Sequence, residues 1–241
     1  SKSLEMKGIK ILDKKELIEK EPNSKILNGL FVPQAGVVDY KFVVQAMSQI
    51  FENNGGEIEY FQKIVDISEY QDSKIVKSKK DTFIGDFIIN CAGLFSDKIA
   101  KLDGLIPKVK IIPFRGEYYE IVTQKSDLLN NMIYPIADPD LPFLGIHLTK
   151  NVNGRIEAGP NAVLAFAREG YTWSKINLSQ TLETITYKGM VKLGKKYIKT
   201  GLHEMYRSLN KSAFVKEINR LIPNITSEDL IKKQAGVRAQ A

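Results

Sequence analysis

A histidine lies within an apolar segment that has the pattern of a strand. His147 follows Phe143-Leu144-Gly145-Ile146 and precedes Leu148-Thr149. Because imidazole titrates near neutral pH, histidine is the usual side chain for taking a proton from a hydroxyl group during an oxidation. The alternative is a hydrogen-bonded structural histidine, which the strand position alone favours. His203 stands beside Glu204 at the start of a predicted helix, and we interpret it as structural.

Two arginines have surroundings that would suit an acidic substrate. Arg115 precedes Gly116, where a kinked strand would point its side chain inward, and Arg238 follows Gly236-Val237. A guanidinium binds a carboxylate through two parallel hydrogen bonds, so two arginines suit a dicarboxylate. Two ordinary ion pairs are the alternative. The tyrosines that would bond substrate oxygens, unless they serve only in packing, are Tyr118, Tyr134 and Tyr171.

A turn of mostly small residues follows a predicted buried strand over Phe87–Ile89. The turn is Asn90-Cys91-Ala92-Gly93. Ser96 or Asp97 would then cap a helix that begins near Lys98. Small side chains at the carboxyl end of a strand let a ligand approach the backbone, and the N–H groups at a helix start favour phosphate. A tight turn without a ligand is the alternative.

Several motifs of nucleotide and metal sites are absent from the sequence. No strand leads into Gly-x-Gly-x-x-Gly, and no Walker-type Gly-Lys-Ser/Thr is present. One cysteine and two histidines, far apart in the chain, do not predict a zinc site. Asp138 and Asp140 resemble paired carboxylates, but Pro139 and its neighbours explain them better as a turn. We therefore expect no metal.

The composition is that of an ordinary globular protein, with 43% hydrophobic and 26% charged residues. No apolar run reaches the ~20 residues of a membrane-spanning helix, and the start of the chain lacks the apolar core of a secretory signal. A single cysteine suits a reducing compartment. We expect a cytoplasmic protein, and peripheral contact at the inner face of the cell membrane stays open. The net charge of +7 comes from scattered lysines, which favours a solvated basic surface over nucleic-acid binding.

Apolar periodicity predicts helices and strands in an α+β arrangement. Asp13 would cap a helix over 14–20, and a second helix follows Asp39, ends at Gly55-Gly56 and packs on a sheet. Two further helices are predicted in the last third of the chain, over 182–197 and over 205–214.

The predicted strands fall between these helices. Alternating residues within 57–90 predict an antiparallel meander. A long strand over 109–122 would break at Gly116, and a hairpin would join 143–149 to 155–159.

Four segments of the chain resemble one family when they are taken together. They are Pro113 to Tyr118, Ile133 to His147, Gly159 to Tyr171 and Ala235 to Ala241. These segments are similar to the L-2-hydroxyglutarate dehydrogenase/oxidase family, a branch of the D-amino-acid-oxidase-like FAD oxidoreductases. The similarity extends over nearly the whole chain, from Gly29 onward.

The resemblance implies a flavoenzyme that oxidises L-2-hydroxyglutarate, a dicarboxylate, to 2-oxoglutarate by hydride transfer to FAD. The electrons would pass to a membrane quinone or to oxygen. One alternative is a related oxidase or dehydrogenase of another small acid or amine, such as glycine, sarcosine or glycerol 3-phosphate. The other, from a different class, is a non-catalytic module that binds anions or nucleic acid.

The same resemblance assigns roles to particular residues. Asn90-Cys91-Ala92-Gly93 would lie at the FAD pyrophosphate, and the backbone of Ile64 would flank the adenine. Gly236-Val237-Arg238 would approach the flavin ring and the substrate. His147 is the candidate catalytic residue, as base or as hydroxyl orienter. The predicted substrate-binding residues are Arg115, Tyr134, Asn161 and Arg238.

The resemblance also implies two domains. Residues 38–105 would form part of a glutathione-reductase-like Rossmann domain for FAD, to which 231–241 return. Residues 106–230 would form a mixed-sheet substrate domain with packed helices, and 1–37 would be its lead-in. The family also has an N-terminal Gly-x-Gly-x-x-Gly region and a C-terminal FAD segment without counterparts here. We therefore expect an internal fragment that alone binds FAD weakly, if at all, and is inactive.

Overall fold

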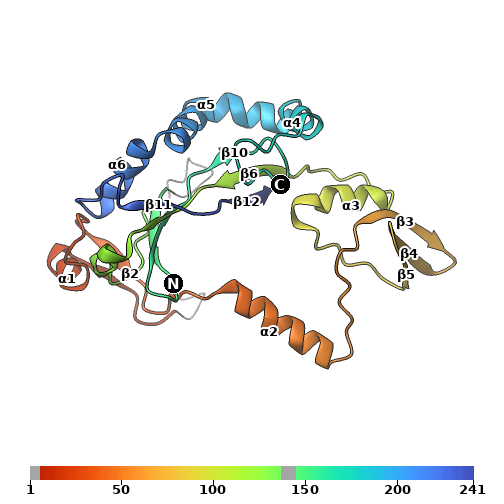
Figure 1. Ribbon diagram of the computed structural model, residues 1–241, viewed down its shortest axis with the longest axis horizontal. Helices are drawn as coiled ribbons and strands as arrows, with labels where there is room; N and C mark the ends of the chain where they lie inside the picture. Colours follow the sequence, from red (N-terminus) through yellow and green to blue (C-terminus); the bar gives the residue numbers. More distant parts are fainter. Residues whose placement is uncertain (1–5, 137–144) are drawn as a thin grey trace. The chain divides into compact units, whose positions relative to one another are not determined.

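The computed structural model describes residues 6–136 and 145–241. The chain divides into two compact units, and Figure 1 labels their elements. The first unit contains Ser1–Tyr40, Arg115–Val163 and Leu193–Gly236. The second contains Lys41–Phe114, Leu164–Lys192 and Val237–Ala241. Residues 164–192 therefore lie with the second unit, whereas the sequence placed them in the substrate domain. Which unit binds cofactor and which binds substrate stays a prediction.

A four-stranded antiparallel sheet is the main sheet of the first unit. Its order is β11 (Leu230–Lys232), β7 (Tyr119–Ile121), β9 (Ile156–Gly159) and β8 (His147–Lys150). The hairpin predicted over 143–149 and 155–159 is confirmed from His147 onward. Residues 145 and 146 are not part of the strand, and 143 and 144 lie outside the described residues.

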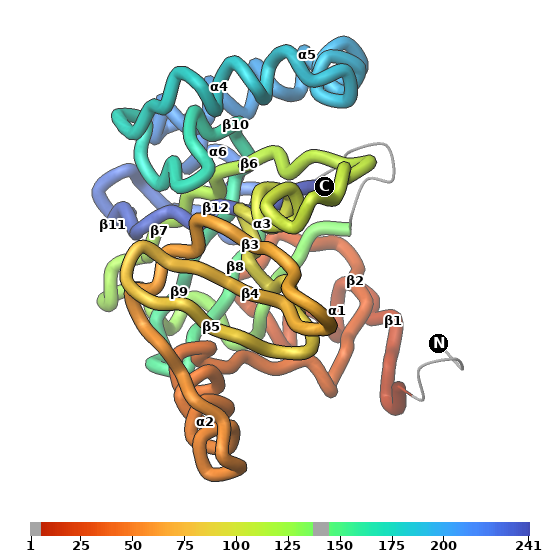
Figure 2. The backbone as a smooth tube through the Cα atoms, turned by 90° about the vertical axis from the view of Figure 1, so that its right-hand side faces the viewer, coloured from red at the N-terminus to blue at the C-terminus, as the bar shows by residue number. Residues whose placement is uncertain are grey.

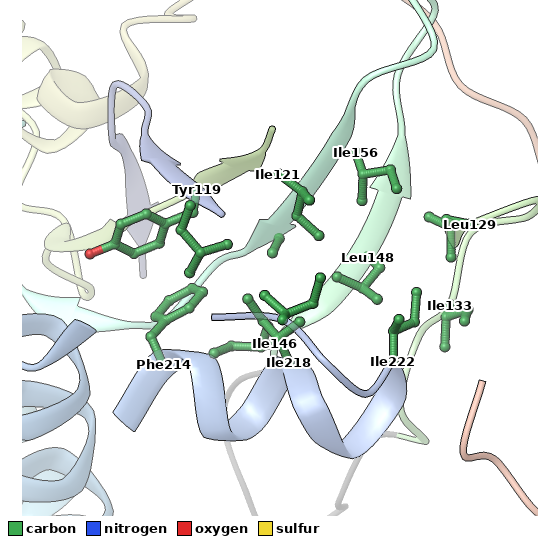
Figure 3. Close-up of a cluster of buried hydrophobic side chains, with 13 residues drawn as sticks. Tyr119, Ile121, Leu129, Ile133, Ile146, Leu148, Ile156, Phe214, Ile218 and Ile222 are labelled. Atoms are coloured by element: carbon green, nitrogen blue, oxygen red, sulfur yellow. The ribbon is translucent and has the colours of Figure 1, made fainter. Parts of the chain in front are cut away.

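The α6 helix (Lys211–Leu221) covers one face of this sheet, as Figure 3 shows. Asn210 caps it by accepting a hydrogen bond from the backbone N–H of Ala213. Phe214 is fully buried, and its ring meets that of Tyr119 edge-on with centroids 4.7 Å apart. Burying one such apolar side chain stabilises the fold by about 1.5–3 kcal/mol.

Side chains of β8 and β9 alternate between the two faces of the sheet. Leu148, Ile156 and Ala158 are fully buried in the core beside α6. Because successive residues of a strand point to opposite faces, His147 and Thr149 lie on the other face. The apolar core thus determines the side of the sheet on which His147 is presented.

The N-terminal part of the first unit is a short hairpin with a helix between its strands. β1 (Lys10–Leu12) pairs antiparallel with β2 (Gly29–Phe31), and α1 (Lys14–Lys20) lies between them in sequence. The predicted cap of α1 is confirmed. The Asp13 carboxylate accepts from the N–H of Glu16 at 2.9 Å, and the Glu16 carboxylate accepts from the N–H of Asp13 at 3.1 Å.

Three other helical elements lie in the first unit or directly before one of its segments in the sequence. A 3-10 segment, η3, covers Thr123–Leu128. The long helix α5 (Lys188–Leu209) has a kink at Tyr197. The sequence predicted one helix over 182–197, but α4 (Leu178–Ile185) and α5 are separate, so this prediction is wrong.

The second unit contains the predicted antiparallel meander, which is confirmed. Its strands are β3 (Ile64–Tyr70), β4 (Ser73–Ser78) and β5 (Thr82–Gly85). The α3 helix (Ser96–Leu102) contacts β3, and Figure 1 and Figure 2 both place it beside that strand. An ion pair between Lys74 Nζ and Asp103 Oδ1, 2.9 Å apart, fastens the end of α3 to β4.

A three-stranded sheet is formed by short strands from three distant parts of the chain. Its order is β10 (Val163–Leu164), β6 (Ile112–Gly116) and β12 (Gly236–Gln240). The strand predicted over 109–122 is present as β6 and β7, with the predicted break after Gly116.

Two predictions for the second unit are wrong. Residues 86–92 form no strand, and the side chains of Phe87 and Ile89 are 90% and 87% exposed. A strand needs a neighbour to bond its backbone, and no described strand pairs with this segment. The helix after Asp39 exists as α2 (Tyr40–Asn53), but it buries none of its residues, so its predicted packing on a sheet is not found in the described chain.

Candidate functional site

His147 and Tyr134 form a stacked pair in the first unit. Their ring centroids are 4.2 Å apart and their planes differ by 17°. The Tyr134 hydroxyl lies 3.1 Å from the Thr149 hydroxyl, with which it forms a hydrogen bond. Tyr134 reaches this position because Ile133 pairs with Leu148 of β8 in an isolated antiparallel bridge. Two of the predicted site residues are therefore neighbours, held by a strand and the segment that pairs with it.

The other contacts of His147 determine its protonation. Nδ1 lies 3.3 Å from the carbonyl oxygen of Gly145. Because a carbonyl oxygen only accepts, Nδ1 carries the proton in this bond and Nε2 of the neutral ring is an acceptor. Burial lowers the pKa of His147 below its ordinary value, and the Gly145 carbonyl opposes that shift. The imidazole is thus neutral at pH 7 and suited to receive a proton at Nε2.

Tyr118 is a further phenol of the same unit. Burial raises its pKa, and the negative charge of Glu157 and the nearby Tyr134 raise it further. Tyr118 therefore stays protonated near neutral pH. It is a hydrogen-bond donor rather than a base.

A cavity of about 480 Å³ in the first unit is bordered by Tyr134. Its lining is mainly apolar, and Lys20 supplies its cation. The Lys20 ammonium lies 4.3 Å from the centre of the Phe31 ring, which is the geometry of a cation–π contact. The buried Glu21 carboxylate on the same wall accepts from the Asn131 side chain at 2.7 Å. One cation beside one carboxylate does not make the predicted dicarboxylate site by itself.

Arg115 and Asn161 belong to a buried polar network around Glu117. Arg115 Nε lies 3.3 Å from Glu117 Oε1, and Asn161 Nδ2 lies 3.0 Å from Glu117 Oε2. The Ser208 hydroxyl also donates to Glu117 Oε2. The side chain of Arg115 is 1% exposed, and burial lowers its pKa while Glu117 opposes that shift. The carboxylate that Arg115 contacts in this structure is therefore that of Glu117.

Close backbone approach places Asn161 beside Glu117. Gly159 has φ of +143°, and a Cβ there would lie 2.7 Å from the Glu117 carbonyl oxygen. Only glycine allows both this conformation and this separation. The peptide bond between Gly159 and Pro160 is cis. The Gly159-Pro160-Asn161 segment is thus fitted to the residues that link β6 and β7.

The turn over Asn90–Gly93 lies in the second unit and is mostly exposed. Asn90 Nδ2 donates to the Ser96 carbonyl at 2.8 Å, and Asn90 Oδ1 accepts from the N–H of Ala92 at 3.2 Å. Gly93 has φ of +51° and begins a short 3-10 segment, η2 (Gly93–Phe95). The side chain of Asn90 therefore organises the turn from within.

The predicted cap of the following helix is wrong. The α3 helix begins at Ser96, and its N-cap residue, Phe95, makes no side-chain capping bond. The Ser96 hydroxyl instead donates to the Gly93 carbonyl at 2.8 Å. Asp97 is buried and forms an ion pair with Arg168 at 2.6 Å. Sequence reasoning missed this role of Asp97 and Arg168, and it also missed Glu117.

The two units separate the predicted site residues into two sets. The first unit holds Arg115, Tyr134, His147, Asn161 and Gly236. The second holds Ile64, Asn90, Cys91, Ala92, Gly93, Val237 and Arg238. Within the first, His147 lies with Tyr134, and Arg115 and Asn161 share Glu117.

Within the second unit the four turn residues are contiguous, and Ile64 begins β3. Gly236, Val237 and Arg238 are consecutive residues of β12. Asp138 and Asp140 lie outside the described residues. In the part of the chain that the structure describes, no group of three or more histidine, cysteine or acidic side chains is arranged to hold a metal.

Comparison with solved structures defines the fold class. The L-alpha-glycerophosphate oxidase of Mycoplasma pneumoniae, solved with FAD bound, superposes with a TM-score of 0.70 and 19% identity, over 96% of this chain and 53% of that one. Glycine oxidase of Geobacillus kaustophilus superposes with a TM-score of 0.66 and 13% identity, over 99% and 53%. The chain thus has the α+β fold of FAD-dependent oxidases, as the sequence predicted.

The amino-acid sequence defines the family. Residues 2–240 match the DAO family, described as FAD dependent oxidoreductase, and the chain belongs to that family. It is 44% identical over 237 residues to the L-2-hydroxyglutarate dehydrogenase of Indibacter alkaliphilus, and 40% identical over 231 residues to that of Escherichia coli K12. It is 35% identical over 246 residues to the human mitochondrial L-2-hydroxyglutarate dehydrogenase. The resemblance predicted from the four segments is confirmed.

These matches cover 98%, 95% and 97% of this chain, in the order given. The chain in turn spans 59%, 55% and 53% of those relatives. It therefore corresponds to little more than half of each relative's length.

Proposed function

We propose that this chain is part of an FAD-dependent dehydrogenase or oxidase that converts L-2-hydroxyglutarate to 2-oxoglutarate. The observation that carries the proposal is the identity of 35–44% with curated L-2-hydroxyglutarate dehydrogenases along 95–98% of the chain. The reaction removes a hydride from the hydroxyl-bearing carbon and a proton from its hydroxyl group. The chemistry supplied by bound FAD is acceptance of the hydride.

The residues of the second unit fit this cofactor. A Cβ at Gly93 would meet no atom within 4 Å, so there is open space beside the backbone of the turn. The side chain of Asn90 is engaged within the turn and leaves that space clear. A turn of this kind suits the pyrophosphate of a dinucleotide, which binds where small residues expose the backbone. In the proposal Asn90, Cys91, Ala92 and Gly93 hold the pyrophosphate and Ile64 contacts the adenine.

His147 is the residue that we assign to the substrate proton. Its Nδ1–H donates to the Gly145 carbonyl, so Nε2 is the nitrogen that can accept the hydroxyl proton. Its lowered pKa keeps the ring unprotonated at neutral pH, which a base requires. Stacking on Tyr134 restricts rotation of the ring. Orientation of this kind is a large part of what a protein contributes to a hydride transfer.

The predicted substrate-binding residues divide into two groups in this proposal. Tyr134 adjoins His147, and Arg238 has an exposed side chain in β12, so both are assigned direct contact with the substrate. Gly236 and Val237 precede Arg238 and are assigned to the flavin ring. Arg115 and Asn161 are buried around Glu117 and hold the 159–161 segment in place. Their direct contact with a substrate carboxylate stays a prediction.

The test uses the protein expressed from its complete gene. We expect the purified protein to carry one FAD and to oxidise L-2-hydroxyglutarate with an artificial electron acceptor. The comparison compounds are D-2-hydroxyglutarate, glycine, sarcosine and glycerol 3-phosphate. A preference for one of the last three would assign the protein to another branch of its family. Absence of bound flavin, together with a salt-dependent shift of an oligonucleotide, would favour the anion-binding module.

A membrane quinone is the electron acceptor that we propose. No helix in the described part of the chain is long and apolar enough to cross a membrane. Peripheral contact with the membrane, which the sequence left open, is part of this proposal. Reduction of a soluble quinone analogue faster than consumption of oxygen would support this acceptor, and the reverse order would make the protein an oxidase.

A further inference from the structure

Arg168 and Asp97 form a two-pronged ion pair inside the second unit. Arg168 Nη1 lies 2.6 Å from Asp97 Oδ1, and Nη2 lies 2.7 Å from Asp97 Oδ2. Both side chains are 4% exposed. Burial alone would raise the pKa of Asp97, but the hydrogen bonds and charge of Arg168 lower it below its ordinary value. The pair is therefore charged on both sides, which is the strongest form of this contact.

The same guanidinium also contacts the turn that precedes α3. Arg168 Nη1 donates to the backbone carbonyl of Leu94, directly after Gly93. The Phe95 ring lies beside it, with its centroid 5.8 Å from Arg168 Cζ. Arg168 thus touches Leu94, Phe95 and Asp97, three of the four residues that follow the Asn90–Gly93 turn.

The pair is itself held firmly by the rest of the unit. The backbone N–H of Arg168 donates to Gln180 Oε1 of α4 at 2.8 Å. Asp97 Oδ2 also accepts from the backbone N–H of Ile111, at 3.4 Å. A planar guanidinium whose Nη1 and Nη2 are both hydrogen-bonded has little freedom to rotate. It therefore fixes the position of the Leu94 carbonyl relative to α3 and α4.

The turn has few other restraints. Its internal hydrogen bonds come from the side chains of Asn90 and Ser96 and from the backbone N–H of Phe95, which donates to the Ala92 carbonyl at 2.9 Å. No residue of η2 is buried. The buried pair of Asp97 and Arg168 adds a restraint from the interior of the unit, through the Leu94 carbonyl.

We propose that Asp97 and Arg168 are positioning residues for the cofactor. They hold Leu94 and thereby orient the Asn90–Gly93 backbone toward the pyrophosphate of FAD, without touching FAD themselves. This inference rests on the proposed function of the turn. Lysine in place of Arg168 would keep the charge but lose the planar fork, so it could not bond both Asp97 oxygens and the Leu94 carbonyl in the same way.

A second ion pair provides a matched control. Lys98 Nζ lies 2.8 Å and 2.7 Å from the two oxygens of Glu183. It joins α3 directly to α4, the helix that Arg168 contacts through Gln180, and Lys98 is the residue next to Asp97. Its contacts do not include the 90–95 turn. Lys98→Met should therefore loosen α3 without moving the Leu94 carbonyl.

The experiment measures the dissociation constant of FAD for the apoprotein by quenching of flavin fluorescence, in protein expressed from the complete gene. Thermal unfolding of each apoprotein gives its stability. We expect Arg168→Lys and Asp97→Asn each to raise the dissociation constant by tenfold or more. Lys98→Met should change it less than twofold, even where its melting temperature falls as much as that of the other variants.

Three results would overturn the inference. One is FAD binding by Arg168→Lys and Asp97→Asn that is as tight as that of the parent. Another is an equal loss of FAD binding in Lys98→Met, because the effect would then follow general loosening of α3. The third is a parent that does not bind FAD, which would refute the proposed function of the turn as well and so differs from the first two. Arg168→Lys is the main variant because it conserves charge and is the change most compatible with folding.

Discussion

Glu117 and Asn161 are joined by two hydrogen bonds that link residues far apart in the sequence. The backbone N–H of Glu117 donates to Asn161 Oδ1 at 2.8 Å, and Asn161 Nδ2 donates to Glu117 Oε2 at 3.0 Å. Both side chains are almost completely buried. Because Arg115 and Ser208 donate to the same carboxylate, Glu117 connects β6, the segment after β9 and the end of α5.

Replacement of Glu117 should therefore be costly. Glu117→Gln leaves the buried charge of Arg115 without its carboxylate, and breaking a buried pair in this way costs about 3–5 kcal/mol. Ser208→Ala removes one donor and should cost about 1–2 kcal/mol. Urea unfolding measures both changes. A loss for Glu117→Gln no larger than that for Ser208→Ala would contradict the central position of Glu117.

Gly159 should tolerate no side chain. Gly159→Ala places a Cβ 2.7 Å from the Glu117 carbonyl oxygen, at a φ of +143°. Gly154 is the control, since its φ is +77° and a Cβ there would meet nothing within 4 Å. Gly154→Ala should cost about 1–2 kcal/mol from its backbone conformation alone. We expect Gly159→Ala to cost clearly more in the same unfolding assay, and equal losses would refute the close approach.

His147 should make stability depend on pH. Burial lowers its pKa below the ordinary value of 6.5, so the unfolded chain binds this proton more readily than the folded chain. Its contribution to the free energy of unfolding is therefore present above pH 6.5 and lost as the pH falls below that value. We expect His147→Asn to reduce the fall in stability between about pH 7 and about pH 5. His203→Asn, the same substitution at an exposed position, is the control.

Tyr134 should act through its ring more than through its hydroxyl. Tyr134→Phe keeps the ring that stacks on His147 and is assigned to the substrate, and it loses the hydroxyl with its bond to Thr149, so turnover should change little. Tyr134→Ala loses the stack, a contact of about 0.5–1.5 kcal/mol, which corresponds to roughly a tenfold loss at most. Turnover rates of the two variants with L-2-hydroxyglutarate decide the point. If Tyr134→Phe is as impaired as Tyr134→Ala, the hydroxyl carries the role.

Local sequence patterns predicted the elements that depend on neighbours in the chain. Alternating residues gave the β3-β4-β5 meander, and Asp13 with Glu16 gave the start of α1. The strand predicted at Phe87–Ile89 failed because a strand depends on a partner, which its own residues do not specify. The α2 helix shows the same limit. The spacing of its apolar residues predicted a helix, but it did not specify which element would pack against the apolar face.

The site residues that the family pattern named stay predictions, although two of them, Tyr134 and His147, are neighbours in the structure. Contacts between residues far apart in the sequence were not predictable. Asp97 has the position of a helix cap, yet Arg168, 71 residues later, binds its carboxylate. The role of Glu117 could not be predicted, because its partners Asn161 and Ser208 lie 44 and 91 residues away in the sequence. Only the folded chain brings these charges and amides together.

The most direct measurement of the proposed chemistry is a single turnover without oxygen. The flavoprotein, expressed from its complete gene, is mixed anaerobically with L-2-hydroxyglutarate, and loss of the visible absorption of oxidised flavin is followed in time. We predict rapid bleaching with the L enantiomer and none with the D enantiomer. The rate in His147→Asn should be lower by about a hundredfold or more, as expected on removal of a general base. A flavin that L-2-hydroxyglutarate does not reduce, or a His147→Asn rate equal to that of the parent, would contradict the account.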